Sequence, residues 1–127
     1  MTAGRKPRLR TCENGATAVE FAIVSPIFIM LLLGIIYGCL LMYTMGSLHY
    51  AVQAAARCGA VMTATCGSAA ATQTYALNHY YALNNPTPQF TASAAACGQQ
   101  VTGSLTYILD VAFARWSIPL SATACFP

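Results

Sequence analysis

Few side chains in this sequence could carry out acid–base or nucleophilic chemistry. Beyond residue 20 the only carboxylate is Asp110, and His49 and His79 lie in no motif that places a nucleophile beside them. General acid–base catalysis needs such a group within reach of the reacting atoms. Trp116 and the seven tyrosines are expected in the core and at interfaces. We therefore predict no enzyme, no catalytic residue and no cofactor.

Glu20 is the acidic residue with an unusual position. It precedes an apolar run from Phe21 to about Met45, and about 20 mostly apolar residues suffice to cross a bilayer as a helix. A carboxylate at the start of such a span is costly, which by default indicates a function. Further along the run, Gly34 and Gly38 form a Gly-x-x-x-Gly pattern. This pattern predicts a helix contact, with chance spacing as the alternative.

Formal charge is concentrated at the N-terminus. Residues 1–15 contain four of the six basic side chains and one acid, whereas the charges of residues 16–127 cancel. A nucleic-acid-binding domain would keep a basic face on its folded part, so we expect no nucleic-acid partner. By the positive-inside rule, the cluster instead predicts a cytoplasmic N-terminus and a C-terminus across the membrane.

Four of the six cysteines follow the apolar run, namely Cys58, Cys66, Cys97 and Cys125, whereas Cys12 and Cys39 do not. Cysteines in a small exported domain favour disulfides, and no Cys-x-x-Cys or histidine spacing predicts a metal site. We favour Cys97–Cys125, which neighbouring strands could bring together, with Cys58–Cys66. The second pair requires a turn after Cys58, because eight helical residues rise about 12 Å. The crossed pairing, Cys58–Cys97 with Cys66–Cys125, stays open.

The N-terminal residues resemble the processing site of type IV pilins and pseudopilins. A short basic leader precedes Gly15, and Glu20 would be the fifth residue of a chain cut between Gly15 and Ala16. Within that superfamily, the residues Gly-Ala-Thr-Ala-Val-Glu-Phe-Ala-Ile-Val-Ser-Pro, from Gly15 to Pro26, are most similar to the TadE-like family. These are the minor pseudopilins of the tight-adherence (Flp-type) pilus system. An Ala-rich stretch that ends at Arg57 is also similar.

The resemblance implies partners, a location and a role for Glu20. The partners would be a prepilin peptidase, other pilins or pseudopilins, the pilus assembly platform and membrane lipid. The location would be the bacterial inner membrane, crossed once, with the C-terminus periplasmic and incorporation into an extracellular pilus left open. After cleavage, Glu20 would pair with the new amine of a neighbouring subunit's Ala16, and such a buried pair would fix subunit register.

The predicted fold class is α+β and pilin-like. We expect a cytoplasmic leader over 1–15, a transmembrane and extended N-terminal helix over 16–58, and an exported, disulfide-bonded α+β domain over 59–127. A short second helix should begin at a Ser68 cap and end near Asn84. Its packing side would contain Leu77, Tyr80, Tyr81 and Leu83.

The last third of the chain predicts a small antiparallel sheet packed on the exported part of the long helix. Runs of Thr, Val, Ile, Tyr and Phe between Gly and Pro indicate strands near 91–96, 101–109 and 117–126. Pro119 cannot donate to a ladder, so its strand should be an edge or carry a bulge.

The sequence thus predicts a minor pseudopilin that takes part in assembly of a Tad/Flp-type adhesive pilus after processing by prepilin peptidase. The alternative is an uncleaved bitopic membrane protein, whose disulfide-bonded domain binds a partner or ligand outside the cytoplasm. A chain that starts at Ala16 would support the first hypothesis, and one that retains residues 1–15 would support the second.

Overall fold

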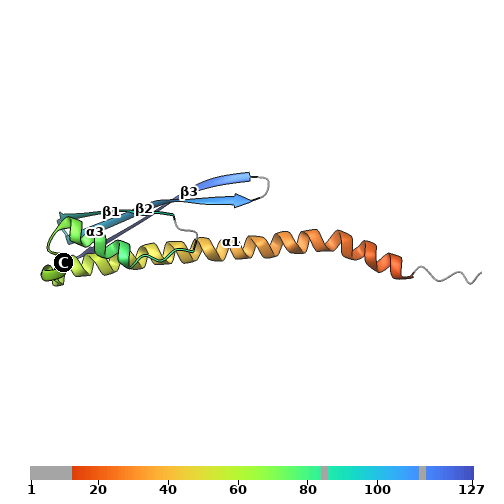
Figure 1. Cartoon of the computed structure of the whole chain (residues 1–127), viewed down its shortest axis with the longest axis horizontal. Helices are drawn as coiled ribbons and strands as arrows, with labels where there is room; N and C mark the ends of the chain where they lie inside the picture. The colour runs from red at the N-terminus through yellow and green to blue at the C-terminus, as the bar shows by residue number, and fades with distance from the viewer. Residues whose placement is uncertain (1–12, 84–85, 112–113) are drawn as a thin grey trace, which may run out of the picture. The chain divides into compact units, whose positions relative to one another are not determined.

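The computed structural model describes residues 13–83, 86–111 and 114–127. Its elements, in chain order, are α1 (Glu13–Val61), α2 (Thr63–Cys66), α3 (Ala69–Asn78), β1 (Gln89–Ala95), β2 (Gly98–Val111) and β3 (Ala114–Phe126) (Figure 1). The predicted α+β, pilin-like fold is confirmed, with a long N-terminal helix, a short helix and a three-stranded antiparallel sheet. The basic cluster and Cys12 lie outside the described residues.

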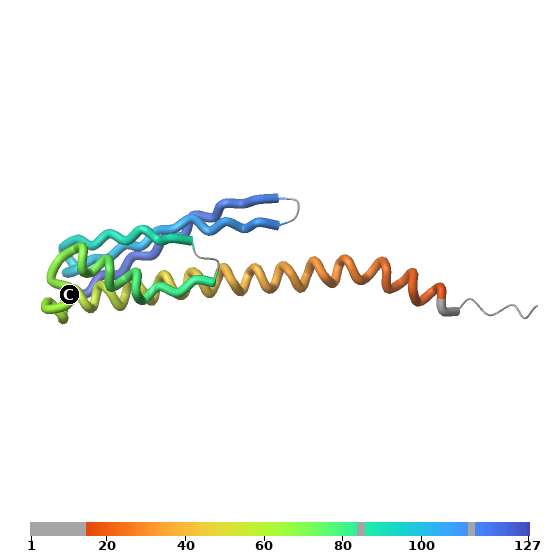
Figure 2. Tube along the Cα trace, viewed as in Figure 1, coloured from red at the N-terminus to blue at the C-terminus, as the bar shows by residue number. Residues whose placement is uncertain are grey.

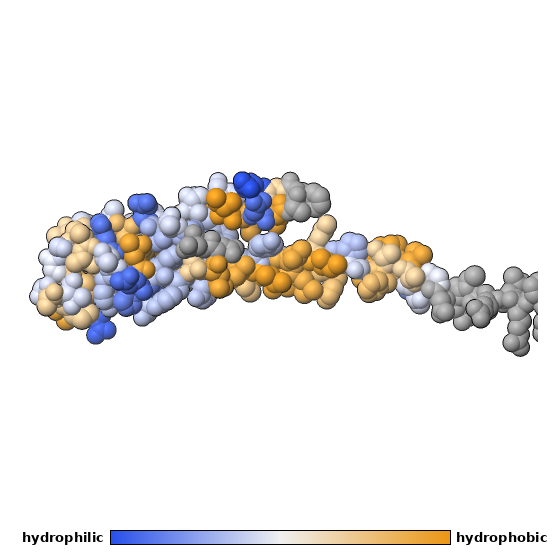
Figure 3. Space-filling model, viewed as in Figure 1, coloured by the Kyte–Doolittle hydropathy of each residue, from blue (hydrophilic) through white to orange (hydrophobic). Residues whose placement is uncertain are grey.

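The chain divides into two compact units, residues 1–36 and 37–127. The described part of the first unit is α1 alone, and its large apolar side chains, among them Phe21, Ile29 and Ile35, are exposed. Apolar surface therefore covers this part of the helix in Figure 3. The second unit contains the rest of α1 and all the other elements.

The sheet has the strand order β1-β2-β3, with antiparallel pairing throughout. The turn between β1 and β2 is tight, because Ala95 pairs with Gly98 across it. Gly98 has a φ of +117°, a conformation that glycine adopts without steric cost. Pro119 lies in β3, opposite Thr106, and β3 is an edge strand as predicted.

The core of the second unit lies between one stripe of α1 and one face of the sheet. The stripe repeats at helical spacing and consists of Leu48, Ala51, Val52, Ala55 and Ala56. The sheet contributes alternate residues of its strands, chiefly Phe90, Val101, Leu105, Tyr107, Leu120 and Ala122. The sheet is therefore packed on this part of α1, as the sequence predicts.

The second helix is shorter than the sequence suggests. Ser68 caps it as predicted, because its side-chain oxygen accepts from the Ala71 amide at 3.2 Å. The helix ends at Asn78, six residues before the expected end. The Tyr80 ring then packs edge-on against Phe90, with 6.4 Å between centroids, and the Tyr81 amide donates to Ser47 Oγ at 2.7 Å. These contacts need a non-helical backbone, which propensity alone does not reveal.

The expected packing side of this helix was also mostly wrong. Leu77, Tyr81 and Leu83 are exposed, and only Tyr80 packs against the core. Thr72 and Ala76 are the buried residues of α3. The Thr72 hydroxyl donates to the Ser68 and Cys66 carbonyls at 3.0 and 3.2 Å, so small side chains let α3 lie close to the preceding turn.

Two disulfides close the second unit, Cys58–Cys66 and Cys97–Cys125, with Cα–Cα distances of 5.7 and 6.2 Å. This is the pairing that the sequence favoured over the crossed one. α1 continues through Gly59 to Val61, and a break at Met62 reverses the chain into the one-turn helix α2, which the sequence did not predict (Figure 2). That reversal brings Cys66 back to Cys58.

Gly103 permits the close approach of the sheet to α1. A Cβ added there would lie 2.7 Å from Phe90 Cε1 and 2.9 Å from Leu48 Cδ1. We predict that Gly103→Val lowers the free energy of unfolding by about 1–3 kcal/mol through overpacking. Urea unfolding of the full chain in detergent, monitored by near-ultraviolet circular dichroism of the tyrosines, measures this change. Ser104→Val is the control, because Ser104 is exposed, and its change should stay within about 0.5 kcal/mol. Equal midpoints for both variants would contradict the packing.

The Cys97–Cys125 disulfide should contribute measurably to stability. We predict that the double variant Cys97→Ala, Cys125→Ala loses about 2–4 kcal/mol in the same unfolding measurement, because an unlinked unfolded chain has more conformational freedom. Cys39→Ala is the matched control, since Cys39 is a free, exposed cysteine. Peptide mapping without reductant should join the Cys97 and Cys125 peptides, and free thiols at both positions would refute the bond.

Candidate processing and assembly site

The residues expected at the processing site lie together on α1. Gly15, Ala16 and Glu20 are all exposed, and a Cβ added to Gly15 would meet no atom within 4 Å. Ala16 and Glu20 are four residues apart, so they lie on the same face of the helix, one turn from each other. No side chain of the described residues thus obstructs the backbone at Gly15, and Glu20 lies near the same end of α1.

Glu20 is surrounded by apolar side chains. Val19, Phe21, Ile23 and Val24 are each more than half exposed, and no cation among the described residues forms an ion pair with Glu20. In water this arrangement costs little for the carboxylate, but in lipid a carboxylate needs a partner. Whether the Glu20 carboxylate needs a charge or hydrogen-bond partner therefore depends on what surrounds α1.

Gly34 and Gly38 leave two open positions on α1. Apart from the neighbouring backbone of α1 itself, no atom of the described residues lies within 4 Å of a Cβ added at either residue. A neighbouring helix could approach the backbone closely at each glycine, which is the physical basis of helix contacts through small residues in membranes. Both glycines keep this possible role as a prediction.

The polar side chains described in the second unit make local ion-pair, stacking and hydrogen-bond contacts. Arg115 and Asp110 form an ion pair at 2.6 Å across β2 and β3, and exposed pairs of this kind contribute little to stability. The His79 ring stacks on Tyr75 at 4.1 Å, and its Nδ1 lies 2.9 Å from the Tyr75 carbonyl oxygen. His49 is exposed. In the part of the chain that the structure describes, no three His, Cys, Asp or Glu side chains gather as metal ligands.

Tyr80 is the residue whose acid–base behaviour changes. Burial raises the pKa of its hydroxyl, whose oxygen has no hydrogen-bond partner among the described residues. A raised tyrosine pKa keeps the group neutral over a wider pH range, so it gives Tyr80 no role as a base near neutral pH. Its place between α3 and Phe90 is a packing position.

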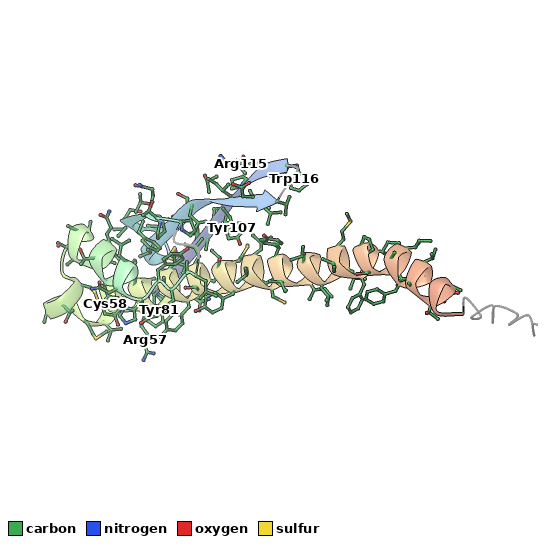
Figure 4. The ribbon with its side chains drawn as sticks, turned by 45° about the vertical axis from the view of Figure 1, so that its right-hand side comes forward. Arg57, Cys58, Tyr81, Tyr107, Arg115 and Trp116 are labelled. Carbon is green, nitrogen blue, oxygen red and sulfur yellow. A yellow bond between two sulfur atoms is a disulfide. The ribbon has the colours of Figure 1, made fainter. Side chains whose placement is uncertain are left out.

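Two surface hollows of about 730 and 810 Å³ lie on the second unit. The first is lined by hydroxyl-bearing and apolar residues of β2 and β3, including Ser104, Thr106 and Ser121. The second lies beside Arg57, Tyr50 and Tyr75, and Arg57 points outward from α1 in Figure 4. Neither is lined by a carboxylate or a histidine, so neither has the groups for acid–base catalysis.

Trp116 lies outside the core, so of the two expected places, core and interface, only the interface remains as a prediction. It is 55 % exposed, on a part of β3 that lies beyond the buried cluster. Trp116 pairs with Leu109 across the ladder, so both belong to an apolar end of the β2–β3 pair. The sequence does not show at which residue the pairing of β1 with β2 begins, so it did not predict that Trp116 lies outside the core.

These observations define a class of protein. Among the described residues, α1 is the one helix long and apolar enough to cross a membrane, and a small disulfide-bonded α+β unit follows its apolar part. This arrangement fits a single-pass membrane protein of pilin-like fold.

Residues 15–57 match the model of the TadE-like protein family. The match confirms the family that the N-terminal residues predicted, and it includes Gly15, Ala16, Glu20, Gly34 and Gly38. The family suggests a Tad pilus-associated protein with a structural rather than an enzymatic role, which interacts with other pilus components. Neither the curated proteins nor the solved structures that were searched match the chain.

Proposed function

We propose that this protein is a minor pseudopilin that takes part in assembly of a Tad/Flp-type adhesive pilus, after a prepilin peptidase removes residues 1–15. One observation carries the proposal: the matched segment 15–57 begins at Gly15, and Glu20 follows as an exposed carboxylate on an otherwise apolar helix surface. A helix of this kind must be covered by lipid or by other helices, since no described residue of the first unit covers its apolar side chains.

The role of Glu20 follows from its surroundings. Cleavage after Gly15 creates a cationic amine at Ala16, and the carboxylate of a neighbouring subunit can neutralise it. In an apolar bundle such a pair removes the cost of two unpaired charges. A helix displaced by one turn would leave both charges unpaired, so the pair selects one register. Gly34 and Gly38 would allow the helices to approach closely in that register.

The remaining chain serves as an exported unit on the inner-membrane helix. The proposed topology has the N-terminus in the cytoplasm and the C-terminus in the periplasm, because the basic residues of 1–12 precede the span. The two disulfides support this assignment, since such bonds persist in oxidising compartments. The partners are prepilin peptidase, other pilins or pseudopilins, and the assembly platform.

Cleavage is tested by the mass of the N-terminal peptide of the chain produced with and without a prepilin peptidase. We expect the chain to start at Ala16 only when the peptidase is present. Gly15→Ala should be processed poorly and Gly15→Leu not at all, because a side chain there obstructs the peptidase. Gly46→Leu is the control, since Gly46 is another open glycine of α1 and lies far along the chain. Normal processing of Gly15→Leu would refute the site, and an intact N-terminus in all samples would favour the uncleaved bitopic alternative.

Topology is tested by reporter fusions. Alkaline phosphatase attached after Pro127 should be active, because it folds only outside the cytoplasm, whereas the same enzyme attached after Glu13, before the apolar run, should be inactive. A fluorescent cytoplasmic reporter should give the opposite pattern at the two positions. The reverse result at Pro127 would show that the chain has the other orientation.

A further inference from the structure

β2 and β3 continue past the sheet as a two-stranded ribbon. β1 pairs with β2 only as far as Ser104, opposite Gln89, whereas β2 and β3 remain paired from Leu105–Leu120 to Val111–Ala114. Figure 1 shows both strands extending beyond the end of β1. We name this part, residues 105–111 and 114–120, the ribbon. An isolated two-stranded ribbon is marginally stable in water, so its free end needs another source of support.

One face of the ribbon is apolar and continues from the core toward the free end. Leu105 and Tyr107 are buried on that face, with Tyr107 only 2 % exposed, and Leu109 follows them with the period of a strand. Its partner across the ladder is Trp116, which is 55 % exposed. Figure 4 shows Trp116 near the free end of the ribbon, beyond Tyr107. Apolar surface thus continues where no protein covers it among the described residues.

Contacts within the second unit show that the ribbon extends toward the N-terminal end of that unit's part of α1. A Cβ on Gly59 would touch Gln99, and one on Gly103 would touch Leu48, so β2 runs antiparallel to α1. Each later residue of β2 therefore lies nearer the end at which Tyr37 begins the unit. There α1 presents Met42, which is 74 % exposed, and Tyr43, which is about half exposed. A span of about 20 residues from Phe21 ends close to these positions.

The ribbon and this part of α1 share one apolar surface. Leu109 and Ile118 of the ribbon and Leu41 and Met45 of α1 all pack against the same core cluster. Within the second unit, the exposed apolar residues Met42 and Tyr43 of α1 therefore lie beside residues that pack against the same cluster as the ribbon. This proximity favours lipid over a second protein as the occupant of that face.

The charges of the ribbon are also compatible with a membrane surface. Its only formal charges, Asp110 and Arg115, neutralise each other at 2.6 Å. They lie one residue away from Leu109 and Trp116, so they project from the opposite face. Figure 3 shows hydrophilic and apolar surface side by side on this part of the sheet. Trp at a boundary between apolar and polar surroundings is the pattern of membrane–water interfaces.

We infer that the free end of the ribbon rests on the headgroup layer of the membrane that α1 crosses, with Trp116 as its interfacial anchor. The inference rests on the membrane span of the proposed function, but on neither cleavage nor assembly. The contact holds the second unit against the membrane surface before any assembly, and α1 keeps it permanently close to lipid. Removal of the chain from the membrane would release Trp116.

Trp116 is the only tryptophan of the chain, so its fluorescence reports this site alone. The full chain is reconstituted in phosphatidylcholine–phosphatidylglycerol vesicles that contain phosphatidylcholine brominated at a shallow or a deep acyl position. We expect a blue-shifted emission, loss of emission with the shallow bromines greater than with the deep ones, and protection from aqueous acrylamide. Urea that unfolds the second unit should abolish the difference.

The matched control moves the reporter within the same unit. The variant Trp116→Phe with Tyr50→Trp places the tryptophan on α1 at a position that is 56 % exposed and lies beyond Leu48 from the span. It should be quenched by acrylamide and be insensitive to brominated lipid. Both proteins should remain with the vesicles on flotation at alkaline pH, which reports the span independently of the ribbon.

Three results would overturn the inference. Flotation with Trp116 open to acrylamide and insensitive to bromine would refute the anchor while leaving the span intact. A blue shift that appears only at high protein-to-lipid ratio, without bromine quenching, would assign the face to a second copy. Failure of both proteins to float would refute the span, and with it the topology on which the proposed function depends.

Discussion

Close packing between one stripe of α1 and the sheet is the interaction on which the second unit depends. The small side chains of Ala51, Ala55 and Ala56 let the sheet lie close to that stripe. On the sheet side, Gly103 has no side chain to separate the strand from Leu48. Burial of apolar area is the dominant favourable term in folding. A unit of this size buries only a small apolar area, so its stability depends on this contact. The sheet therefore has no core of its own. It folds against the C-terminal part of α1, whereas the N-terminal part of the same helix has the exposed apolar surface of a membrane span.

That division explains the composition of α1. From Phe21 to Ile36 its large apolar side chains are all exposed, as a helix in lipid requires, whereas from Leu48 onward one face of the helix is buried against the sheet. Thr44 lies at the change and donates its hydroxyl to the Leu40 carbonyl at 2.9 Å, which satisfies that polar side chain within the helix. The composition of one continuous helix thus fits lipid in one part and a water-exposed unit in the other, with no break in the backbone between them.

Local pattern predicted the elements better than their ends. The apolar run, the Ser68 cap and the alternation of β2 specify their structures through short-range rules, so the long helix, the start of α3 and the three strands were correctly predicted. The end of α3 depends on Tyr80 meeting Phe90 and on the Tyr81 amide reaching Ser47, contacts between residues far apart in sequence. The exposure of Trp116 likewise depends on where β1 begins, which β2 and β3 do not encode. At the candidate processing site, the residue types and spacing of Gly15, Ala16 and Glu20 were visible in the sequence because a motif of this kind is local.

Both disulfides of the second unit lie at the end away from the ribbon. Cys58–Cys66 fixes the end of α1 to α2, and Cys97–Cys125 fixes the β1–β2 turn to the end of β3, close to where Gln99 meets Gly59. The ribbon end has no such crosslink, and the exposed Asp110–Arg115 pair adds little there. Under the proposed function, a subunit that leaves lipid for a bundle of helices must change what covers its apolar surfaces without unfolding. Neither disulfide joins the sheet to α1, so packing such as that of Leu48 against Gly103 would have to keep the sheet on α1 during that exchange.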